Sequence, residues 1–253
     1  MKAKIIISLC LMFLISTFGC QKNVNQDPAS FPQDSKLVCL FFDDAYANQY
    51  EETLHILLEY DFKATFGVIT NHIGKGHDLW EYMNERKLRV LADHGMDIGG
   101  HTKTHPDLTT LTDEQMRDEI IGSKQALENM GFEVRTMLYP YFTWNDKVIE
   151  YTKEAGYTCG RAGWTERNVY DINTDDPEER YHVTAWQISD QDMDTFKIIV
   201  GRADYNSVVC LVYHFIADTG PEGTATPVAN FQEQMAYLYN TGYTVVLLPD
   251  LFK

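Results

Sequence analysis

“LVCLFF”, residues 37–42, is an unbroken apolar run, and it decides the class of fold. A strand that is apolar on both sides of its pleat is buried on both faces, which is typical of a parallel sheet covered by helices. Residues 48–62 follow with apolar positions at helical spacing, and residues 64–70 are again strand-like. The start of the chain therefore predicts a strand–helix–strand unit.

The rest of the chain repeats this alternation. Helical patterns cover 79–95, 111–131, 145–156, 191–204 and 228–242. Strand-like runs cover 96–102, 134–141, 157–163, 181–188, 207–215 and 243–251. Thr112, with Gln115 three residues later, predicts a capping box at the start of one helix. Seven or eight strands joined by helices require crossover connections, so we expect a distorted (β/α) barrel of mostly parallel strands rather than an open doubly wound sheet.

The first twenty residues predict an export signal that is not part of the fold. Two lysines precede an apolar run over 5–18, which is too short to cross a bilayer comfortably. Cys20 directly follows Gly19, an arrangement that resembles the lipobox of bacterial lipoproteins. We therefore expect lipidation at Cys20; the alternative is an ordinary secreted or periplasmic protein.

The remaining chain divides into a tether and one domain. Residues 21–35 are polar with two prolines and predict a flexible tether, and 36–253 are long enough for one catalytic domain but short for two. The formal net charge of −16 argues against nucleic acid and anionic lipid surfaces as partners. We expect a monomer that meets the membrane through its lipid anchor only.

Three cysteines remain once the signal is set aside. Cys39, Cys159 and Cys210 lie far apart in short apolar segments without the spacing of a metal-binding motif. This pattern favours buried cysteines that act as small hydrophobic residues. One disulfide with one thiol left over is the alternative.

Residues with useful chemistry follow several of the expected strands. They are Asp43 and Asp44, His101 and His105, the stretch Leu138 to Phe142, and His214. Because active groups of a parallel barrel gather at the C-terminal ends of its strands, we expect these residues to lie together. The alternatives are ordinary structural roles: a helix cap for the aspartates, a solvated loop for the histidine pair and a core position for His214.

The histidine pair and one aspartate have the composition of a metal site. Spacing of four places the rings of His101 and His105 on one side of a turn. Two imidazoles and the Asp44 carboxylate form a triad that leaves positions open for water and substrate. Zinc is the first expectation for this set, and cobalt or iron would also fit.

“FFDDAY”, “HTKTH”, “LYPYF” and “LVYHF”, in this order along a βα chain, resemble the motifs of NodB-like polysaccharide deacetylases, carbohydrate esterase family four. The resemblance covers essentially all of 36–253. It implies that a divalent metal, most often Zn²⁺, is bound by Asp44, His101 and His105. The ion would lower the pKa of a bound water toward neutrality.

The resemblance also implies the catalytic roles. Asp43 would accept a proton as the water attacks an acetyl carbonyl, and the backbone N–H of Tyr141 would stabilise the developing oxyanion. His214 would protonate the departing nitrogen. Pro140 and Tyr141 match the family's third motif, and we expect Tyr141 and Trp144 to contact the sugar through their rings.

This sequence departs from the family pattern near the expected base and acid residues. Leu138 occupies the position of the arginine that normally pairs with the base aspartate. Arg161, at the end of the next expected strand, is our candidate replacement; the alternative is a plain surface arginine. The fourth motif is not evident, since neither Trp164 nor Trp186 has the expected acidic partner.

The sequence thus predicts a metal-dependent deacetylase of N-acetylated glycans, lipid-anchored in a bacterial envelope outside the cytoplasm. One alternative is an esterase that removes O-acetyl groups, for instance from xylan, with the same site. The other is a carbohydrate-binding lipoprotein that kept the fold and lost the chemistry. The chain itself distinguishes neither the glycan nor the metal.

Overall fold

The computed structural model describes residues 35–77, 80–163, 169–172, 176–203 and 207–252. The expected export signal with Cys20, almost all of the tether, and Trp164 lie outside these residues. Within the described residues, no helix combines the length and apolar character needed to cross a membrane.

A parallel sheet is built around the apolar run that begins the domain. Its strands are β1 (Lys36–Phe42), β2 (Thr65–Val68), β3 (Asp97–Gly100), β4 (Thr136–Leu138), β5 (Cys159–Arg161), β7 (Trp186–Gln187) and β8 (Ser207–Tyr213). The order is β5-β4-β3-β2-β1-β8, with β7 on the far side of β8. All these pairings are parallel, as expected for strands joined by helical crossovers.

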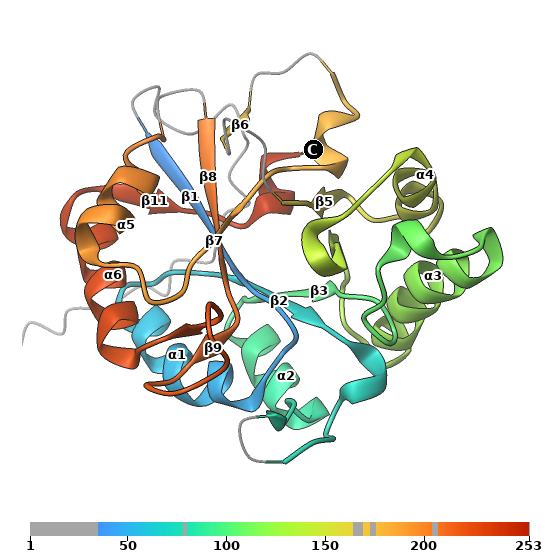
Figure 1. Cartoon of the computed structure of the whole chain (residues 1–253), viewed down its shortest axis with the longest axis horizontal. Coiled ribbons are helices and arrows are strands. Elements are labelled where there is room, and N and C mark those ends of the chain that lie inside the picture. Colours follow the sequence, from blue (N-terminus) through green and yellow to red (C-terminus); the bar gives the residue numbers. More distant parts are fainter. Residues whose placement is uncertain (1–34, 78–79, 164–168, 173–175, 204–206, 253) are drawn as a thin grey trace, which may run out of the picture.

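A short segment before β7 closes the sheet into a barrel (Figure 1). Val183 forms a parallel bridge with Arg161: its amide donates to Gly160 O at 2.9 Å, and its carbonyl accepts from Ala162 N at 2.7 Å. Three residues later, Trp186 pairs with Leu211 of β8. The segment therefore spans the gap between β5 and β8, and the expected distorted (β/α) barrel is confirmed.

Four short strands lie outside the ring. β11 (Tyr243–Val245) pairs with the first half of β1, and β6 (Tyr170–Asp171) runs antiparallel to the start of β8. β9 (Phe215–Ile216) and β10 (Ala225–Thr226) form a separate pair. The last strand was expected to continue to residue 251, but Pro249 lies in a 3₁₀ turn there, since proline cannot donate to a strand ladder.

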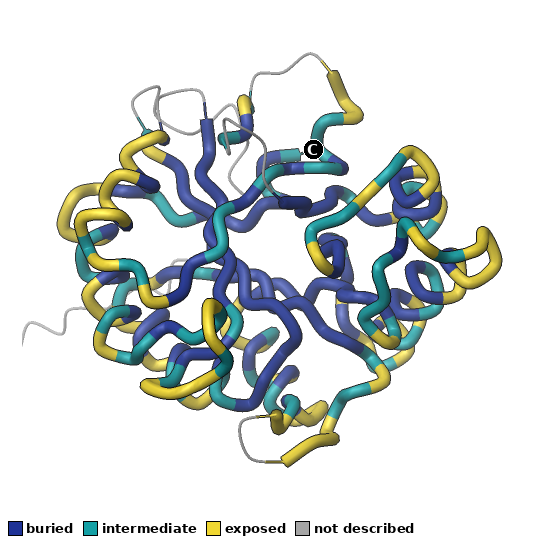
Figure 2. The backbone as a smooth tube through the Cα atoms, viewed as in Figure 1, coloured by how far each residue is buried: buried dark blue, intermediate teal, exposed yellow. Residues whose placement is uncertain are grey.

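In the described part of the chain, six helices surround the strands: α1 (Ala47–Glu59), α2 (Glu85–Asp93), α3 (Asp113–Asn129), α4 (Asp146–Glu154), α5 (Met193–Val200) and α6 (Val228–Asn240). Their outward faces are exposed, whereas the central strands from β1 to β5 and β8 are almost entirely buried (Figure 2). The capping box of Thr112 and Gln115 is present. α2 begins later than expected because Asn84 caps it, accepting a hydrogen bond from Lys87 N at 3.0 Å.

The alternation of side chains along the two central strands fixes what faces the barrel interior. Leu37, Cys39 and Phe41 of β1 share one buried cluster with Val208, Cys210 and Val212 of β8. The intervening residues of both strands pack instead against the helices. Continuing the same two-residue period, the next inward positions are Asp43 and His214. The pleat itself therefore carries these two groups to the mouth of the barrel.

The three cysteines of the domain are buried and free, as the sequence favoured. All three belong to the interior cluster or its wall, and Cys39 and Cys210 are register partners on β1 and β8. Burial raises the pKa of the Cys159 thiol. They behave as small apolar residues in the floor beneath the site.

Candidate metal centre and catalytic site

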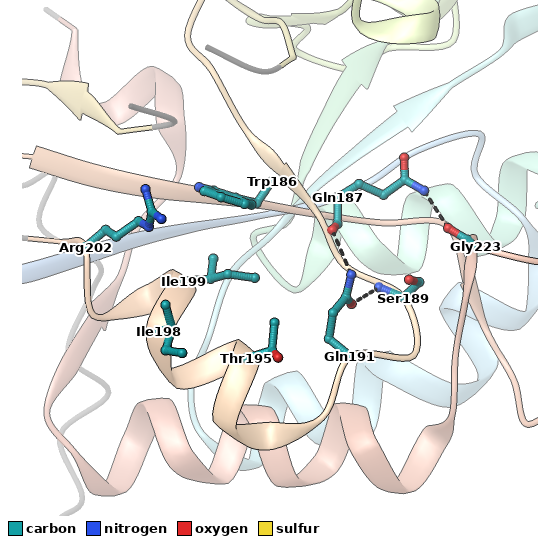
Figure 3. Close-up of a pocket in the computed structure, with 9 residues that line it drawn as sticks. All are labelled: Trp186, Gln187, Ser189, Gln191, Thr195, Ile198, Ile199, Arg202 and Gly223. Atoms are coloured by element: carbon teal, nitrogen blue, oxygen red, sulfur yellow. Dashed lines mark hydrogen bonds between the residues drawn. The ribbon is translucent and has the colours of Figure 1, made fainter. Parts of the chain in front are cut away.

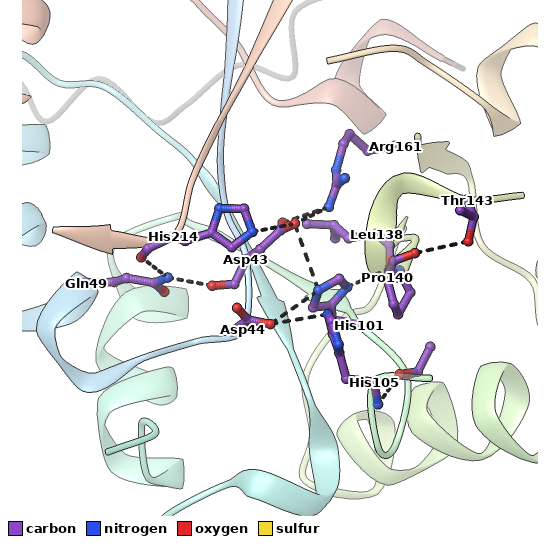
Figure 4. Close-up of polar contacts among 11 residues, drawn as sticks. Asp43, Asp44, Gln49, His101, His105, Leu138, Pro140, Thr143, Arg161 and His214 are labelled. Carbon is purple, nitrogen blue, oxygen red and sulfur yellow. Dashed lines mark hydrogen bonds and ion pairs between the residues drawn. The ribbon is translucent and has the colours of Figure 1, made fainter. Parts of the chain in front are cut away.

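The three predicted ligands converge at the C-terminal mouth of the barrel (Figure 4). Asp44 Oδ1 lies 3.5 Å from His101 Nε2 and 3.5 Å from His105 Nε2. All three ligand atoms lie within 4.8 Å of one another. Ligands about 2.0–2.1 Å from a tetrahedral ion are about 3.4 Å apart, so the geometry fits one divalent ion.

A hydrogen bond from the end of β4 orients the first histidine for metal binding. His101 Nδ1 lies 2.7 Å from the carbonyl oxygen of Leu138, a contact in which the ring nitrogen donates. The other nitrogen, Nε2, is buried and has no hydrogen-bond partner among the described residues. A ring held by one nitrogen with the other left free is the usual arrangement of a metal-binding histidine.

The three groups already interact electrostatically without an ion. Burial alone would raise the pKa of Asp44, but His101, His214 and His105 hold it well below its usual range. Burial alone would lower the pKa of His101, but Asp43 and Asp44 together raise it. For His105, burial and the neighbouring His101 lower the pKa to about 4, so this ring is neutral at neutral pH. Neutral imidazole beside carboxylate is the form that binds metal.

Backbone strain is concentrated around this centre. Among the described non-glycine residues, seven have positive φ, and all except Asp61 belong to the loops of the site: Asp44, Ala45, Thr102, His105, Tyr141 and Phe142. Such conformations cost of order 1–3 kcal/mol each and persist only where the surroundings enforce them. The loops are therefore held in geometries that the chain would not adopt by itself.

Arg161 reaches the carboxylate of Asp43 from the adjoining wall of the barrel. Its Nη2 lies 2.7 and 2.6 Å from the two oxygens of Asp43, and the arginine is completely buried. Its guanidinium also lies 4.7 Å from the centre of the Phe142 ring. Burial rules out the alternative of a plain surface arginine. Arg161 and Leu138 are register partners on β5 and β4.

His214 lies on the other side of the same carboxylate. Its Nε2 is 3.8 Å from Asp43 Oδ2, and His101 Nε2 is 3.9 Å from that oxygen. Asp43 thus stands between the candidate acid and the metal ligands. His214 Nδ1 is buried and has no hydrogen-bond partner among the residues described, so the orienting acid missing from the sequence is not supplied by them.

Gln49, at the start of α1, is a residue that the sequence analysis missed. Its side-chain amide donates to Asp43 O at 2.5 Å and to His214 O at 2.6 Å (Figure 4). One buried nitrogen therefore ties together the strand ends that carry the base and acid candidates. The only sequence signal was a polar residue on the buried face of a helix, which by itself indicates no partner.

The three expected substrate-binding residues occupy different environments. Pro140 is buried, whereas Tyr141 is 61 % exposed with its ring centre 4.8 Å from that of His105. Trp144 is 38 % exposed and stacks on His182, with 4.4 Å between ring centres. Tyr141 lies directly at the metal centre, while one face of Trp144 is already covered.

A second group of rings borders the centre beside Asp44. Tyr46 stacks on Phe215 with 4.0 Å between ring centres and also contacts Trp80 and Tyr82. Trp80 is half exposed. Nothing in the sequence associates Trp80 or Tyr82 with the site, because they are distant from every motif along the chain.

A separate hollow of about 420 Å³ lies on the outer side of β7, against α5 (Figure 3). Trp186, Ile199 and Arg202 line it, and the Arg202 guanidinium lies 4.9 Å from the centre of the Trp186 ring. Its glutamines bond within the hollow and to Gly223. None of the candidate metal ligands lines it.

Comparison with known proteins agrees with the geometry of the mouth. A family model described as polysaccharide deacetylase matches residues 31–160. The chain therefore belongs to the polysaccharide deacetylases, the NodB-like carbohydrate esterase family four that the four motifs indicated.

Individual relatives match only part of their own length. A putative polysaccharide deacetylase, YxkH, of Bacillus subtilis is 32% identical over 49% of this chain and 44% of its own. A bifunctional xylanase/deacetylase of Pseudobutyrivibrio xylanivorans is 22% identical over 95% of this chain and 34% of its own. The chain thus spans less than half the length of these two relatives.

Solved structures support the fold. The Xyl-CE4 domain of a multidomain xylanase from the hindgut metagenome of Trinervitermes trinervoides superposes with a TM-score of 0.58 at 22% identity. The match covers 86% of this chain and 90% of that domain. At this identity the likeness establishes the shared barrel and no more.

Proposed function

We propose that the protein is a metal-dependent hydrolase that removes N-acetyl groups from an extracytoplasmic polysaccharide or oligosaccharide. The observation that carries the proposal is the meeting of Asp44, His101 and His105 at one ion-sized position, with Asp43 beside them. A divalent ion held there, most often Zn²⁺, supplies Lewis acidity toward a carbonyl oxygen and lowers the pKa of water.

Side chains and backbone of the protein supply the base, the oxyanion donor and the acid. Asp43, next to the ligands and paired with Arg161, accepts the proton of the attacking water. The backbone N–H of Tyr141, set by a φ of 54°, donates to the oxyanion that develops on the acetyl group. His214 delivers a proton to the leaving nitrogen, because an amine departs far more readily than an amide anion.

Rings at the mouth would hold the sugar. Tyr141 exposes its ring beside His105, and Trp80 exposes its ring beside Tyr46. Apolar faces of pyranose rings pack well on aromatic side chains. The two rings belong to different loops, an arrangement that suits a sugar with neighbouring units rather than a small free acetamide.

We further propose that the domain is tethered by a lipid on Cys20 in a bacterial envelope, facing away from the cytoplasm. Support comes from the order of signal, cysteine and polar tether in the sequence. The tether joins β1 at Lys36, whereas Asp43 follows its other end, roughly 20 Å away along seven residues. The mouth would then face away from the anchored end.

Acetate release tests the proposal. N-acetylated glycans, including peptidoglycan, chitin oligomers and poly-N-acetylglucosamine, are compared with O-acetylated xylan, each with chelator and with added Zn²⁺. We expect release that chelator abolishes and Zn²⁺ restores. Asp43→Asn should bind Zn²⁺ and release no acetate. Zinc binding with no release from any glycan would instead support the carbohydrate-binding alternative.

An O-acetyl esterase is the second candidate, favoured by the relative described as a bifunctional xylanase/deacetylase. Alcohols leave without strong help from an acid, so the two activities depend differently on His214. For an amidase, His214→Ala should lower kcat by about 10²-fold or more. If acetylated xylan is the better substrate and the variant keeps most of its activity, the esterase assignment replaces ours.

A further inference from the structure

The loop that carries both histidines is strained and short of internal support. Thr102 and His105 both have positive φ, at 65° and 62°. Among the described residues, one side-chain bond within the loop holds the second ligand, from His105 N to Thr102 Oγ1 at 2.9 Å. A geometry of this kind must be enforced from outside the loop.

Glu119, on the inner face of α3, supplies that enforcement. Its Oε2 accepts hydrogen bonds from Lys103 N at 2.7 Å and Thr104 N at 2.9 Å. Its Oε1 accepts from the Thr104 hydroxyl at 2.6 Å. Glu119 is 9 % exposed, so these three bonds to a carboxylate form away from bulk water, where charge-assisted bonds are strong.

The position of these bonds is significant. Lys103 and Thr104 are the two residues just before His105, so the carboxylate holds the middle of the connection between the ligands. We propose that Glu119 is a positioning residue that preorganises His101 and His105 for the divalent ion. This inference rests on the metal centre of the proposed function and extends it to a residue 14 positions beyond the second histidine.

Two variants separate positioning from charge. In Glu119→Gln the amide oxygen can accept both backbone N–H groups, and the Thr104 hydroxyl can turn to accept from the amide nitrogen, so all three bonds survive. In Glu119→Met the shape remains and the bonds are lost. A clamp requires the bonds, whereas a general attraction between Glu119 and the cation requires the charge.

The same helix offers a matched control. Asp118 precedes Glu119 and bonds the side chain of Lys103 through both oxygens, at 2.9 and 2.8 Å. Its side chain is 62 % exposed and, within the part of the chain that the structure describes, makes no hydrogen bond to the backbone of the loop. Asp118→Asn therefore removes a nearby negative charge without loosening the connection between the histidines.

Co²⁺ and Zn²⁺ titrations of the purified, metal-free full-length protein test the inference, with the visible absorption of bound Co²⁺ as a second readout. We expect Glu119→Met to weaken affinity about 10- to 100-fold and to alter the Co²⁺ spectrum. Glu119→Gln and Asp118→Asn should stay within about threefold of the original protein, which is the range of a minor electrostatic change. Circular dichroism establishes that each variant is folded.

Three other outcomes would overturn the inference, and each points to a different cause. Equal affinity in all variants would overturn the clamp while the metal centre stands. A loss in Glu119→Gln as large as in Glu119→Met would assign the effect to charge. Failure of the unchanged protein to bind either ion would overturn both the clamp and the proposed metal centre.

A milder variant covers a failure of Glu119→Met to fold. Thr104→Val deletes one of the three bonds from the exposed side of the loop and leaves α3 intact. We expect it to weaken Co²⁺ binding about threefold to tenfold, the net value of a single typical hydrogen bond, because two of the three bonds to Glu119 remain. Unchanged affinity in this variant would count against the clamp.

Discussion

The ends of β4 and β5 lie side by side in the barrel wall, yet one carries an apolar side chain and the other a positive charge. Leu138 and Arg161 are register partners that both face inward. Leu138 packs over Gly67 and Gly99, where its methyl groups occupy the space that a side chain at either glycine would need. Arg161, one strand further on, carries its guanidinium to Asp43.

The difference shows that the family's arginine position and the family's ion pair are separable. An inward residue on either strand points into the same narrow mouth, so a long side chain from β5 reaches what a neighbour on β4 would reach. β4 is then free to fill the interior with an apolar residue above two glycines. What the proposed reaction needs is a cation beside the Asp43 carboxylate, from whichever strand supplies it.

Arg161→Leu should give the largest effect on this pair. Removing one partner of a buried ion pair costs about 3–5 kcal/mol of stability, because the other charge is left without compensation. We expect kcat to fall by about 100-fold or more, since the Asp43 carboxylate would lose the guanidinium that holds both of its oxygens in place. Urea unfolding and acetate release measure the two losses. Activity within threefold of the original would show that Arg161 has no part in the reaction.

Moving the guanidinium from β5 to β4 tests whether the strand that supplies it matters. The double variant Leu138→Arg with Arg161→Leu exchanges the two side chains and nearly preserves total volume. We expect it to recover activity to within about 10-fold of the original protein, because the cation approaches the same carboxylate from the neighbouring strand. Leu138→Arg alone is the control. Recovery no better than in Arg161→Leu would mean that the strand of origin matters after all.

Features that depend on one short segment of the chain could be predicted from the sequence. The apolar run that forms β1 was recognised from the sequence, and so were the strand–helix alternation and the capping box at Thr112. Contacts between distant segments were harder. Arg161 was proposed from the sequence only because Leu138 stands where the family motif has an arginine, so a replacement cation was sought. Gln49 and Glu119 act on backbone atoms of other segments, and a buried polar residue on a helix does not reveal which backbone it meets.

The barrel also offers a comparison between two fully buried glutamines. Gln49 bonds the carbonyls of Asp43 and His214, whereas Gln234 on α6 accepts from the Tyr213 hydroxyl at 2.9 Å. Gln49→Met should lower kcat about 10-fold with unchanged zinc content, because the base and acid lose their common support. Gln234→Met should leave kcat within twofold. Equal losses of kcat in the two variants would mean that Gln49 is an ordinary core residue with no specific role in positioning the base and acid.

The smallest effect concerns a second buried acid near an arginine, at the other end of the barrel. Asp97 Oδ2 accepts from Thr65 and Thr136 hydroxyls, and Arg135 Nε stays 3.8 Å from Oδ1, unlike the close contact at Asp43. Burial raises the pKa of Asp97 despite these partners.

A raised pKa in the folded state means that the folded protein holds this proton more tightly than the unfolded chain. The Asp97 contribution is therefore fully present below the unfolded value of about 4 and is lost as pH rises through the folded pKa. Asp97→Asn keeps both hydroxyl bonds and removes the titration, so its stability relative to the original protein should increase from pH 4 to pH 7. Urea unfolding at both pH values measures this difference. The opposite trend would mean that Arg135 stabilises an ionised Asp97 as effectively as Arg161 is proposed to stabilise Asp43, and that close contact is not what separates the two pairs.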